Sequence, residues 1–335
     1  MGARETLAFT VTRAEAGERL DRFLRARIPW RSRTNLSRLV ETGLVFLNGL
    51  PAKPATRVGA GDRVETSVRD PRIVSRQPLD VPISILAEDP DFVVVDKPPH
   101  LATHPTARHL QTNVLSALRA RYGEPPPAPV HRLDLETSGV LLCARGKEAH
   151  RALSLQFERR EVQKRYLAIV TGRVEPATGV LDLPLGRHSV SRVRIRVRAG
   201  ERNGTPSRTA FRVLARWKGF SLLALSPHTG RQHQIRAQLE AYGHPVVGDK
   251  IYGPDEAHFL AYLEGRLMAE ARATLLLDRH ALHAASLAFG HPRTGERICV
   301  RSPLPEDLRA FINRIEAGEG GQPKFGGGGG TTPFL

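Results

Sequence analysis

The pattern of hydrophobic and polar positions begins with two short helices followed by a small sheet. Apolar residues recur at helical spacing over residues 18–28 and predict one amphipathic helix. A second helix is predicted from Ser32 to about Thr42, because serine caps helices and a glycine follows. Residues 44–50 then read as a strand that enters an Asn-Gly hairpin turn. We predict a compact unit that ends near Val68. The apolar face of its first helix would consist of Leu20, Phe23, Leu24 and Ile28.

A proline-containing stretch separates this unit from a longer one. Residues 69–82 have little apolar pattern, so we predict a linker there. Apolar strands that begin at Ile83 and Phe92 open an α+β stretch that continues to about Glu316. The glycine-rich residues 318–335 are predicted to be disordered. The predicted domains are therefore residues 12–68 and residues 83–316.

Two later patterns predict one more strand and one more helix. Four arginines alternate with Val193, Ile195 and Val197, and this period of two predicts a strand with guanidinium groups on its outer face. Residues 254–277 carry apolar side chains at helical spacing, which predicts an amphipathic helix packed on the second domain.

The positive charge of the chain is large and clustered. Fifty Lys and Arg against thirty-four Asp and Glu give a net charge of +16. Abundant arginine can come from a GC-rich genome or from a phosphate-rich partner, so composition alone leaves both open. Seven arginines and one acid fall in residues 19–38, which favours the phosphate interpretation and predicts a nucleic-acid surface there. Ten basic residues and one acid between Arg187 and Lys218 predict a second such surface. The first would use Arg22, Arg25, Arg31, Arg33 and Arg38, and the second Arg192, Arg194, Arg196 and Arg198.

Cysteine content and hydropathy exclude two classes of protein. Cys143 and Cys299 are too few for a disulfide scaffold and fit a reducing cytoplasm. No apolar run approaches the roughly 18 residues that cross a bilayer, so we expect no membrane partner. The first six residues fit a loose N-myristoylation pattern that is short and common. We expect a cytoplasmic monomer.

Three polar clusters could carry chemistry. Asp134 stands on a turn-forming segment directly before an apolar strand, a rigid support for a catalytic carboxylate, although taken by itself a cap of the turn is the better interpretation. Arg231 follows a glycine that allows close backbone approach and could reach a carboxylate on another element. Tyr166 is the aromatic residue of a strand over 163–170, where a core tyrosine is an equally good interpretation.

These clusters together resemble the RluA-type pseudouridine synthases from about residue 12 to residue 310. The segment 131–139, HRLDLETSG, is similar to the signature loop of that family. The chain departs from the family pattern at His100, where glycine is usual, and at Gln238, where histidine is usual. The other matching segments are Lys97-Pro98 through His104-Pro105, 229–236 (TGRQHQIR), 243–245 with 248–249 and 252–253, and 281–284 (ALHA).

The resemblance implies a fold, a reaction and a role for four residues. The N-terminal unit is similar to an S4 RNA-binding domain, and the catalytic domain would be α+β with a mixed, mainly antiparallel sheet. The family isomerises uridine to pseudouridine in structured RNA without cofactor or metal. Large-subunit (23S) ribosomal RNA is the expected substrate and transfer RNA the alternative.

The implied roles centre on Asp134. Asp134 would be the essential carboxylate, acting at C1′ of the sugar, at C6 of the base, or in forming a glycal. Arg231 would pair with it and lower its pKa. Tyr166 would stack on the uracil and help to remove the C5 proton, and Arg132 would fill the gap left by the flipped uridine.

Three other interpretations remain open at this point. Asp134 and Glu136 could be the carboxylate pair of a glycoside or nucleoside hydrolase, which would release free uracil. A non-catalytic RNA-binding protein would tolerate the loss of Asp134. A metal site is the weakest alternative, because His100, His104 and His109 have no cysteine or acidic cluster to complete a ligand set.

Overall fold

The computed structural model describes residues 6–28, 33–41, 43–67, 82–105, 109, 112–263 and 266–319. The chain divides into two compact units, residues 1–77 and residues 78–335. The predicted linker lies almost wholly outside the described residues, as do Arg31 and most of the predicted glycine-rich tail. None of the described helices combines the length and apolar character needed to cross a membrane.

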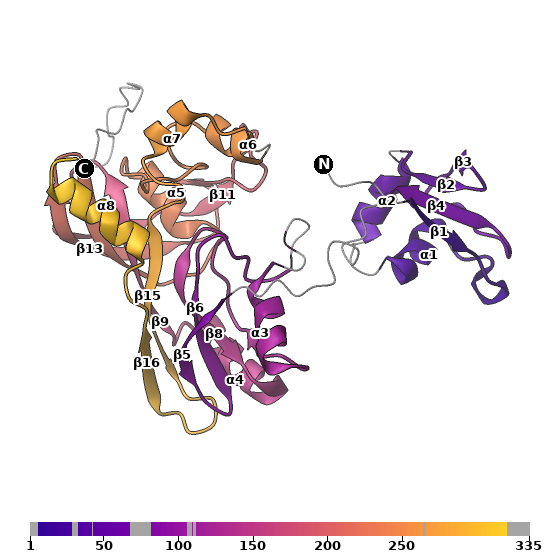
Figure 1. Cartoon of the computed structure of the whole chain (residues 1–335), viewed down its shortest axis with the longest axis horizontal. Coiled ribbons are helices and arrows are strands. Elements are labelled where there is room, and N and C mark those ends of the chain that lie inside the picture. Colours follow the sequence, from indigo (N-terminus) through magenta and orange to yellow (C-terminus); the bar gives the residue numbers. More distant parts are fainter. Residues whose placement is uncertain are drawn as a thin grey trace. The chain divides into compact units, whose positions relative to one another are not determined.

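The N-terminal unit packs two helices on a small antiparallel sheet (Figure 1). The predicted amphipathic helix is confirmed, since the four residues of its apolar face are fully buried. The predicted hairpin turn is also present, with Asn48 and Gly49 both at positive φ. The elements are β1 (Thr6–Thr10), a 3₁₀ turn (Arg13–Glu15), α1 (Leu20–Arg27), α2 (Arg33–Glu41), β2 (Val45–Leu47), β3 (Leu50–Pro51) and β4 (Arg63–Ser67), with sheet order β1-β4-β2-β3.

The second unit is built on a ten-stranded mixed sheet whose central order is β9-β15-β8-β6. Only β15 with β8 pairs in parallel among the described strands, so the predicted mixed, mainly antiparallel sheet is confirmed. The strands are β5 (Ser84–Glu88), β6 (Phe92–Lys97), β7 (Ala128–Pro129), β8 (Ser138–Ala144), β9 (Gln163–Thr171), β10 (Thr178–Asp182), β13 (Arg208–Trp217), β14 (Phe220–Pro227), β15 (Leu282–Gly290) and β16 (Arg297–Arg301). A separate two-stranded sheet is formed by β11 (Leu185–Arg187) and β12 (Val197–Ala199).

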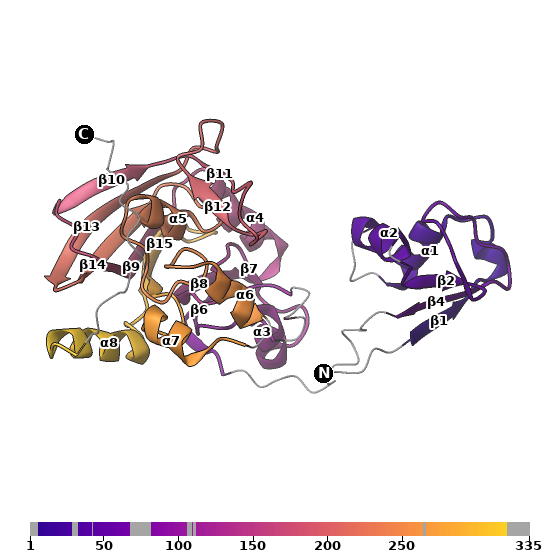
Figure 2. The ribbon, with the colours of Figure 1, turned by 90° about the horizontal axis from the view of Figure 1, so that it is seen from above.

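Helices pack against the sheet because its strands are apolar on both faces. All seven residues of β8 are buried, and β6 alternates its side chains between two hydrophobic clusters. The helix α3 (Val114–Tyr122) contributes to one of these clusters and α4 (Gly146–Glu158) to the other. The helices α5 (Gln234–Ala241) and α8 (Glu306–Glu316) pack with β9 and β14. Figure 2 shows β11 and β12 next to α5, where Ala199 and Ala237 belong to one cluster.

Two of the element predictions are wrong. The single helix predicted over 254–277 is two shorter helices, α6 (Ala257–Leu263) and α7 (Ala269–Leu275). The strand predicted over 192–198 exists only at Val197–Ala199, because residues 191–196 form a turn closed by a hydrogen bond from Arg196 N to Val193 O (2.9 Å). The arginines of this segment therefore do not share one face of a strand.

Candidate active site

A cleft of about 670 Å³ opens in the second unit beside the loop that precedes β8. Its wall is formed by three stretches of chain far apart in the sequence, together with the ends of β9 and β15. The lining residues fall in 130–137, 157–166, 227–236 and at Leu282. The three polar clusters singled out from the sequence, those of Asp134, Arg231 and Tyr166, therefore meet in one place.

The loop that carries Asp134 is fixed from beneath by buried hydrogen bonds. Thr103 Oγ1 donates to Leu133 O (3.0 Å) and accepts from Leu133 N (3.2 Å). The fully buried Lys97 donates from Nζ to three carbonyls, of which Leu135 O (3.1 Å) belongs to the loop. A turn from Thr137 N to Asp134 O (3.1 Å) closes the segment. These contacts support the interpretation of the loop as a rigid mount.

One glycine is required where the loop enters the sheet. Gly139 has φ +111°, and a Cβ there would lie 2.2 Å from Ala284 O on the parallel neighbour β15. Only glycine allows this close approach of two backbones. The position of β15 against β8 thus depends on Gly139. Because β15 begins at Leu282, which lines the cleft, Gly139 also determines where this part of the cleft wall lies.

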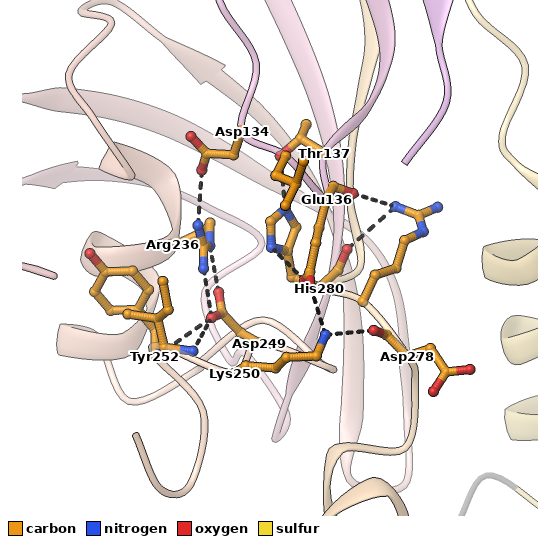
Figure 3. Close-up of polar contacts among 12 residues, drawn as sticks. Asp134, Glu136, Thr137, Arg236, Asp249, Lys250, Tyr252, Asp278 and His280 are labelled. Carbon is orange, nitrogen blue, oxygen red and sulfur yellow. Dashed lines mark hydrogen bonds and ion pairs between the residues drawn. The ribbon is translucent and has the colours of Figure 1, made fainter. Parts of the chain in front are cut away.

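Asp134 pairs with Arg236, which is buried to 4 % exposure on the first turn of α5. Arg236 Nη1 donates to Asp134 Oδ2 (2.9 Å), and its Nε and Nη2 donate to Asp249 Oδ2 and Oδ1 (2.6 and 2.8 Å). Asp249 is itself fixed by the backbone amides of Ile251 (2.9 Å) and Tyr252 (3.0 Å). Figure 3 shows Arg236 between the two aspartates. Asp249 therefore fixes the planar guanidinium of Arg236, and this guanidinium in turn orients the carboxylate of Asp134.

Asp134 is ionised because of these surroundings. Burial alone would raise the pKa of Asp134, but His233, Arg236 and the hydrogen bond from Arg236 lower it to about 2. Burial lowers the pKa of His233 to about 4, so this imidazole is uncharged at neutral pH. Arg236 is then the permanent positive charge that keeps the carboxylate of Asp134 charged.

This pairing corrects the predicted partner of Asp134. Arg231 is exposed and lines the cleft, and the ion pairs of Asp134 within the described residues are to Arg236 and, at 4.0 Å, to His233. The difference arises because α5 begins only at Gln234. Arg236 therefore projects from a helix, whereas Arg231 lies on the preceding turn. Arg132, the residue predicted to enter the RNA, is exposed on the same cleft.

Glu136 turns away from Asp134 into a second buried network. Lys250 Nζ donates to Glu136 Oε1 (2.7 Å), and His280 N donates to Glu136 Oε2 (3.2 Å). Thr137 Oγ1 lies 2.8 Å from His280 Nε2. In Figure 3 Glu136 is directed to Lys250, whereas Asp134 is directed to Arg236. Glu136 is not among the residues that line the cleft, which speaks against a hydrolase that uses these two carboxyl groups as a pair.

Tyr166 lies on β9, half-buried, and lines the cleft. It also packs against two hydrophobic clusters, as expected of a core tyrosine, and its role at the site stays a prediction. Burial and the nearby charge of Asp134 raise the pKa of the Tyr166 phenol above its usual value. The phenol is therefore protonated at neutral pH.

The structure shows the surroundings of the two residues that depart from the family pattern. His100 has φ +62°, in the left-handed region where glycine is favoured. Gln238 is fully buried, its Oε1 accepts from Thr209 Oγ1 (2.6 Å), and its Nε2 lies within hydrogen-bond distance of three carbonyl oxygens, of which Ser207 O is nearest (2.8 Å). Neither residue lines the cleft.

The arginines predicted to bind RNA in the second unit are not equivalent. Arg192, Arg194 and Arg198 are exposed. Arg196 is not available, because its side chain is 14 % exposed and pairs with Glu256 (2.9 Å) and Glu240 (3.1 Å). The prediction of Arg196 as an RNA contact is therefore wrong.

The arginines of the N-terminal unit are more uniformly exposed. Arg22 and Arg25 lie on the solvent side of α1, and Arg22 is 3.2 Å from Glu18. Arg38 lies near the end of α2. The side chain of Arg33, like all of Arg31, lies outside the described residues. Their role as RNA contacts stays a prediction.

One group of side chains has the composition of a metal site, Asp89, Asp91 and His291. Its members already satisfy one another. His291 Nδ1 accepts from the amides of Arg293 (3.1 Å) and Thr294 (3.2 Å), so its proton is on Nε2 and is directed at Asp89 Oδ1 (3.2 Å). A protonated Nε2 is not a metal ligand. The histidines considered from the sequence, His100, His104 and His109, form no such group in the described part of the chain.

Sequence reasoning did not assign a role to several residues that the structure places at the site. Arg236, His233 and Asp249 all fall in segments quoted for the resemblance, yet none was given a function. Lys250 stands next to Asp249 and was not singled out at all. Arg236 contacts Asp134 across 102 residues and Lys250 contacts Glu136 across 114 residues, which no local pattern reveals.

Comparisons with known proteins agree with this geometry. Residues 91–241 match the RNA pseudouridylate synthase family, and residues 18–64 match the S4 domain. The chain is 36% identical over 318 residues to ribosomal large subunit pseudouridine synthase D of Nitrosomonas europaea, with 92% of this chain and 88% of that protein covered. It is 35% identical over 326 residues to an uncharacterized RNA pseudouridine synthase of Aquifex aeolicus, with 94% of this chain and 99% of that protein covered.

Solved structures give the same result. Human RNA pseudouridylate synthase domain containing 4 is similar with a TM-score of 0.55 and 26% identity, covering 70% of this chain and 93% of that one. Human RNA pseudouridylate synthase domain containing 1 is similar with a TM-score of 0.54 and 27% identity, covering 72% and 98%. The fold, the cleft and the relatives lead to one conclusion: this chain is an S4-domain member of the RNA pseudouridine synthase family and an isomerase of uridine in RNA.

Proposed function

We propose that this enzyme converts uridine to pseudouridine in large-subunit ribosomal RNA, and that Asp134 is its catalytic carboxylate. The observation that supports this most directly is the state of Asp134 at the cleft. Arg236 fixes Oδ2 at 2.9 Å, and no hydrogen bond within the described residues reaches Oδ1. One oxygen is thus anchored and the other can meet a substrate.

The reaction requires one bond to be broken and one to be made. The C1′–N1 bond breaks and uracil keeps the electron pair, then the base turns so that C5 bonds to C1′. The C5 hydrogen leaves as a proton and N1 gains one. An ionised Asp134 can attack C1′ or C6, or remove a ribose proton to form a glycal, and each route needs a negative charge that is fixed in place. Arg236 supplies both conditions.

Tyr166 would hold the uracil in the cleft. Its ring lies on the wall that Asp134 faces, and π-stacking holds a base without fixing its rotation. The raised pKa of its phenol makes it a poor base at neutral pH. We therefore assign Tyr166 to stacking in preference to removal of the C5 proton.

The RNA must present its uridine outside the helix, because a stacked nucleotide cannot reach the bottom of a cleft. Arg132 is exposed on the cleft and stands two residues before Asp134, a suitable place to occupy the gap in the stack. Arg231 and Arg160 add positive charge on the same cleft, where phosphates flanking the flipped nucleotide would lie.

The choice of ribosomal RNA rests on the relatives. The protein from Nitrosomonas europaea is named for the large ribosomal subunit, and a second relative of that name, from Xanthomonas campestris pv. campestris, is 34% identical over 304 residues. The S4 domain supplies a second RNA-binding unit in addition to the catalytic one. Transfer RNA is the alternative substrate.

The proposal is tested with ribosomal RNA tritiated at C5 of uridine. The wild-type enzyme should release tritium to water without free uracil, and Asp134→Asn should lower this rate by several orders of magnitude while RNA affinity changes little. Asp182→Asn, the same change at an exposed position on β10, should behave as wild type. Tritium release by Asp134→Asn near the wild-type rate contradicts the role of Asp134, and free uracil indicates a hydrolase.

The substrate is identified by mapping pseudouridine in total RNA from cells with and without the gene. Loss of a modification from the large ribosomal RNA supports the proposal. Loss confined to transfer RNA contradicts the choice of substrate and leaves the reaction intact.

A further inference from the structure

His233 lines the cleft in a left-handed backbone conformation, with φ +54°. An ordinary side chain pays strain energy there, and such strain concentrates at functional sites. The conformation is maintained by Gln234, the next residue, whose Oε1 accepts from Thr229 Oγ1 (2.7 Å) and from Arg231 N (3.1 Å). The turn before α5 is thereby fixed, and it directs the His233 ring toward Asp134.

Tyr252 and Asp134 favour the same tautomer of His233. The amide of Val197 donates to the Tyr252 hydroxyl oxygen (3.0 Å), so the hydroxyl proton is free to be donated to His233 Nδ1 (3.1 Å). With Nδ1 as the acceptor of this hydrogen bond, the ring proton is on Nε2, where it faces the carboxylate of Asp134 at 4.0 Å. The Tyr252 ring is held in place by the guanidinium groups of Arg236 (5.1 Å) and Arg196 (5.5 Å).

The Nε2–H of His233 has no partner of its own within the described residues. The nearest acceptor is Asp134 Oδ1 at 4.0 Å, which is too long for a hydrogen bond. His233 is 9 % exposed and lines the cleft. A buried, oriented donor thus faces the cleft beside the unanchored oxygen of Asp134.

We propose that His233 is a catalytic residue whose Nε2–H donates a hydrogen bond to an oxygen of the target nucleotide next to the bond that breaks. Two oxygens flank the C1′–N1 bond, the uracil O2 and the ribose 2′-oxygen. This proposal rests on the proposed function, because it takes Asp134 as the group that reacts with the nucleotide.

The chemical benefit follows from where the electrons go. When the C1′–N1 bond breaks, uracil keeps the electron pair, and the negative charge spreads from N1 to O2. A fixed neutral N–H donor at that oxygen stabilises the departing base and retains its own proton throughout. A donor to the 2′-oxygen would instead hold the ribose with C1′ facing Asp134. The ring is neutral at working pH, since burial lowers its pKa to about 4.

The test compares His233→Asn with His233→Gln. The amide nitrogen of Gln reaches nearly as far as Nε2, whereas that of Asn reaches only as far as Nδ1. Asn also tolerates positive φ, so the first variant keeps the backbone. We expect His233→Asn to lower the single-turnover rate of tritium release by about 10²–10³-fold, as loss of a transition-state donor does. We expect His233→Gln to retain clearly more activity, and RNA affinity to be unchanged in both.

Tyr252→Phe is a second variant that leaves His233 in place. It removes the hydroxyl that favours the Nε2–H tautomer, so it should lower the rate with less effect than His233→Asn. His150→Gln, the same change on α4 away from the cleft, is the matched control and should be fully active. A rate near wild type for His233→Asn overturns the proposal. Equal losses in the Asn and Gln variants, with equal falls in melting temperature, show a purely structural role and also overturn it.

Altered substrates identify the oxygen. Target RNA with 2-thiouridine weakens the acceptor at O2, and RNA with 2′-deoxyuridine removes the 2′-oxygen. If His233 contacts that oxygen, His233→Asn should cause little further loss on the corresponding substrate. If the loss of rate from His233→Asn and the loss from the altered substrate are fully additive for both substrates, His233 contacts neither oxygen. Tritium release by the wild-type enzyme tests the proposed isomerisation, and the His233 variants test the role of His233. If wild type releases tritium and the His233 substitutions leave that rate unchanged, only the role of His233 is refuted.

Discussion

The helix α1 and the floor of the cleft are both rich in arginine, and they use the guanidinium group in opposite ways. The side chain of Arg22 on α1 is 76% exposed, whereas that of Arg236 is 5% exposed and is bonded to two aspartates. A phosphate backbone is long and variable, so its contacts are best made by exposed cations that can adjust. A reacting carboxylate needs a charge that does not move.

Clustering of arginines along a sequence therefore does not reveal which of them are exposed and unpaired enough to bind a ligand. Arg196 stands in a run of alternating arginines, yet two glutamates from α5 and the segment before α6 already neutralise it. The buried guanidinium of Arg279 is likewise paired with an acidic side chain, that of Asp307 (2.6 Å). The comparison predicts different consequences for loss of an exposed and of a buried cation.

The largest effect is expected for Arg236→Met. Loss of this charge should lower the isomerisation rate by about 10²–10³-fold. Since Arg236 lowers the pKa of Asp134, that pKa should rise, and the carboxylate should become protonated at a higher pH. The acidic limb of the pH–rate profile therefore moves to higher pH. Tritium release measured across pH checks both effects.

Arg231→Met is the matched control, with the same change five residues away. It should leave the acidic limb in place, because Arg231 does not contact Asp134. Arg236→Lys keeps the charge but cannot bridge two carboxylates, and it should keep the acidic limb lower than Arg236→Met does. An unmoved limb in Arg236→Met, with the native fold shown by circular dichroism, contradicts the pairing.

An intermediate effect, on stability, is expected for Lys250→Met. The substitution leaves Glu136 buried without its cation, which costs about 3–5 kcal/mol of the free energy of unfolding. The loss should be smaller in the double variant Lys250→Met with Glu136→Gln, because no buried charge is then left over. Unfolding in urea measures both. A single variant as stable as wild type would show that the pair contributes nothing.

The smallest effect is expected for Arg22→Ala combined with Arg25→Ala. Stability should hardly change, since both side chains are exposed. The slope of log affinity for RNA against log salt should become shallower by roughly 0.7–0.9 for each phosphate that is no longer neutralised. Arg27→Ala is the control, because Arg27 is less exposed and is bonded to Glu15 (2.6 Å). If Arg27→Ala made the slope of log affinity against log salt equally shallow, the exposure of an arginine would not decide whether it binds RNA.

Apolar periodicity was the reliable guide to the fold. The helix at Leu20–Arg27 and the buried strand at Ser138–Ala144 were predictable because burial of apolar side chains determines both. The alternation around Arg194 failed for a tertiary reason. Glu256, from the segment before α6, accepts from Ser191 Oγ (2.5 Å) and Arg196 Nη1 (2.9 Å) and holds the chain in a turn.

The candidate site was predictable in its location and not in its connections. The loop of Asp134 and the segment 229–236 were both identified, and both line the cleft. Arg231 was predicted as the partner in place of Arg236, because the start of α5, which decides which of them projects toward the loop, cannot be read from the local sequence. Likewise, nothing local shows that Glu136 bonds Lys250, 114 residues further along the chain.

The position of β15 between β9 and β8 has a consequence for synthesis of the protein. This strand begins at Leu282 and supplies the neighbour that Gly139 meets, so the central sheet closes only when nearly the whole chain has left the ribosome. The contacts Asp134–Arg236 and Thr137–His280 span 102 and 143 residues, and such non-local contacts form late. The N-terminal unit has its own core and can fold first. In a growing chain the S4 domain can therefore form before the cleft and its Asp134–Arg236 pair.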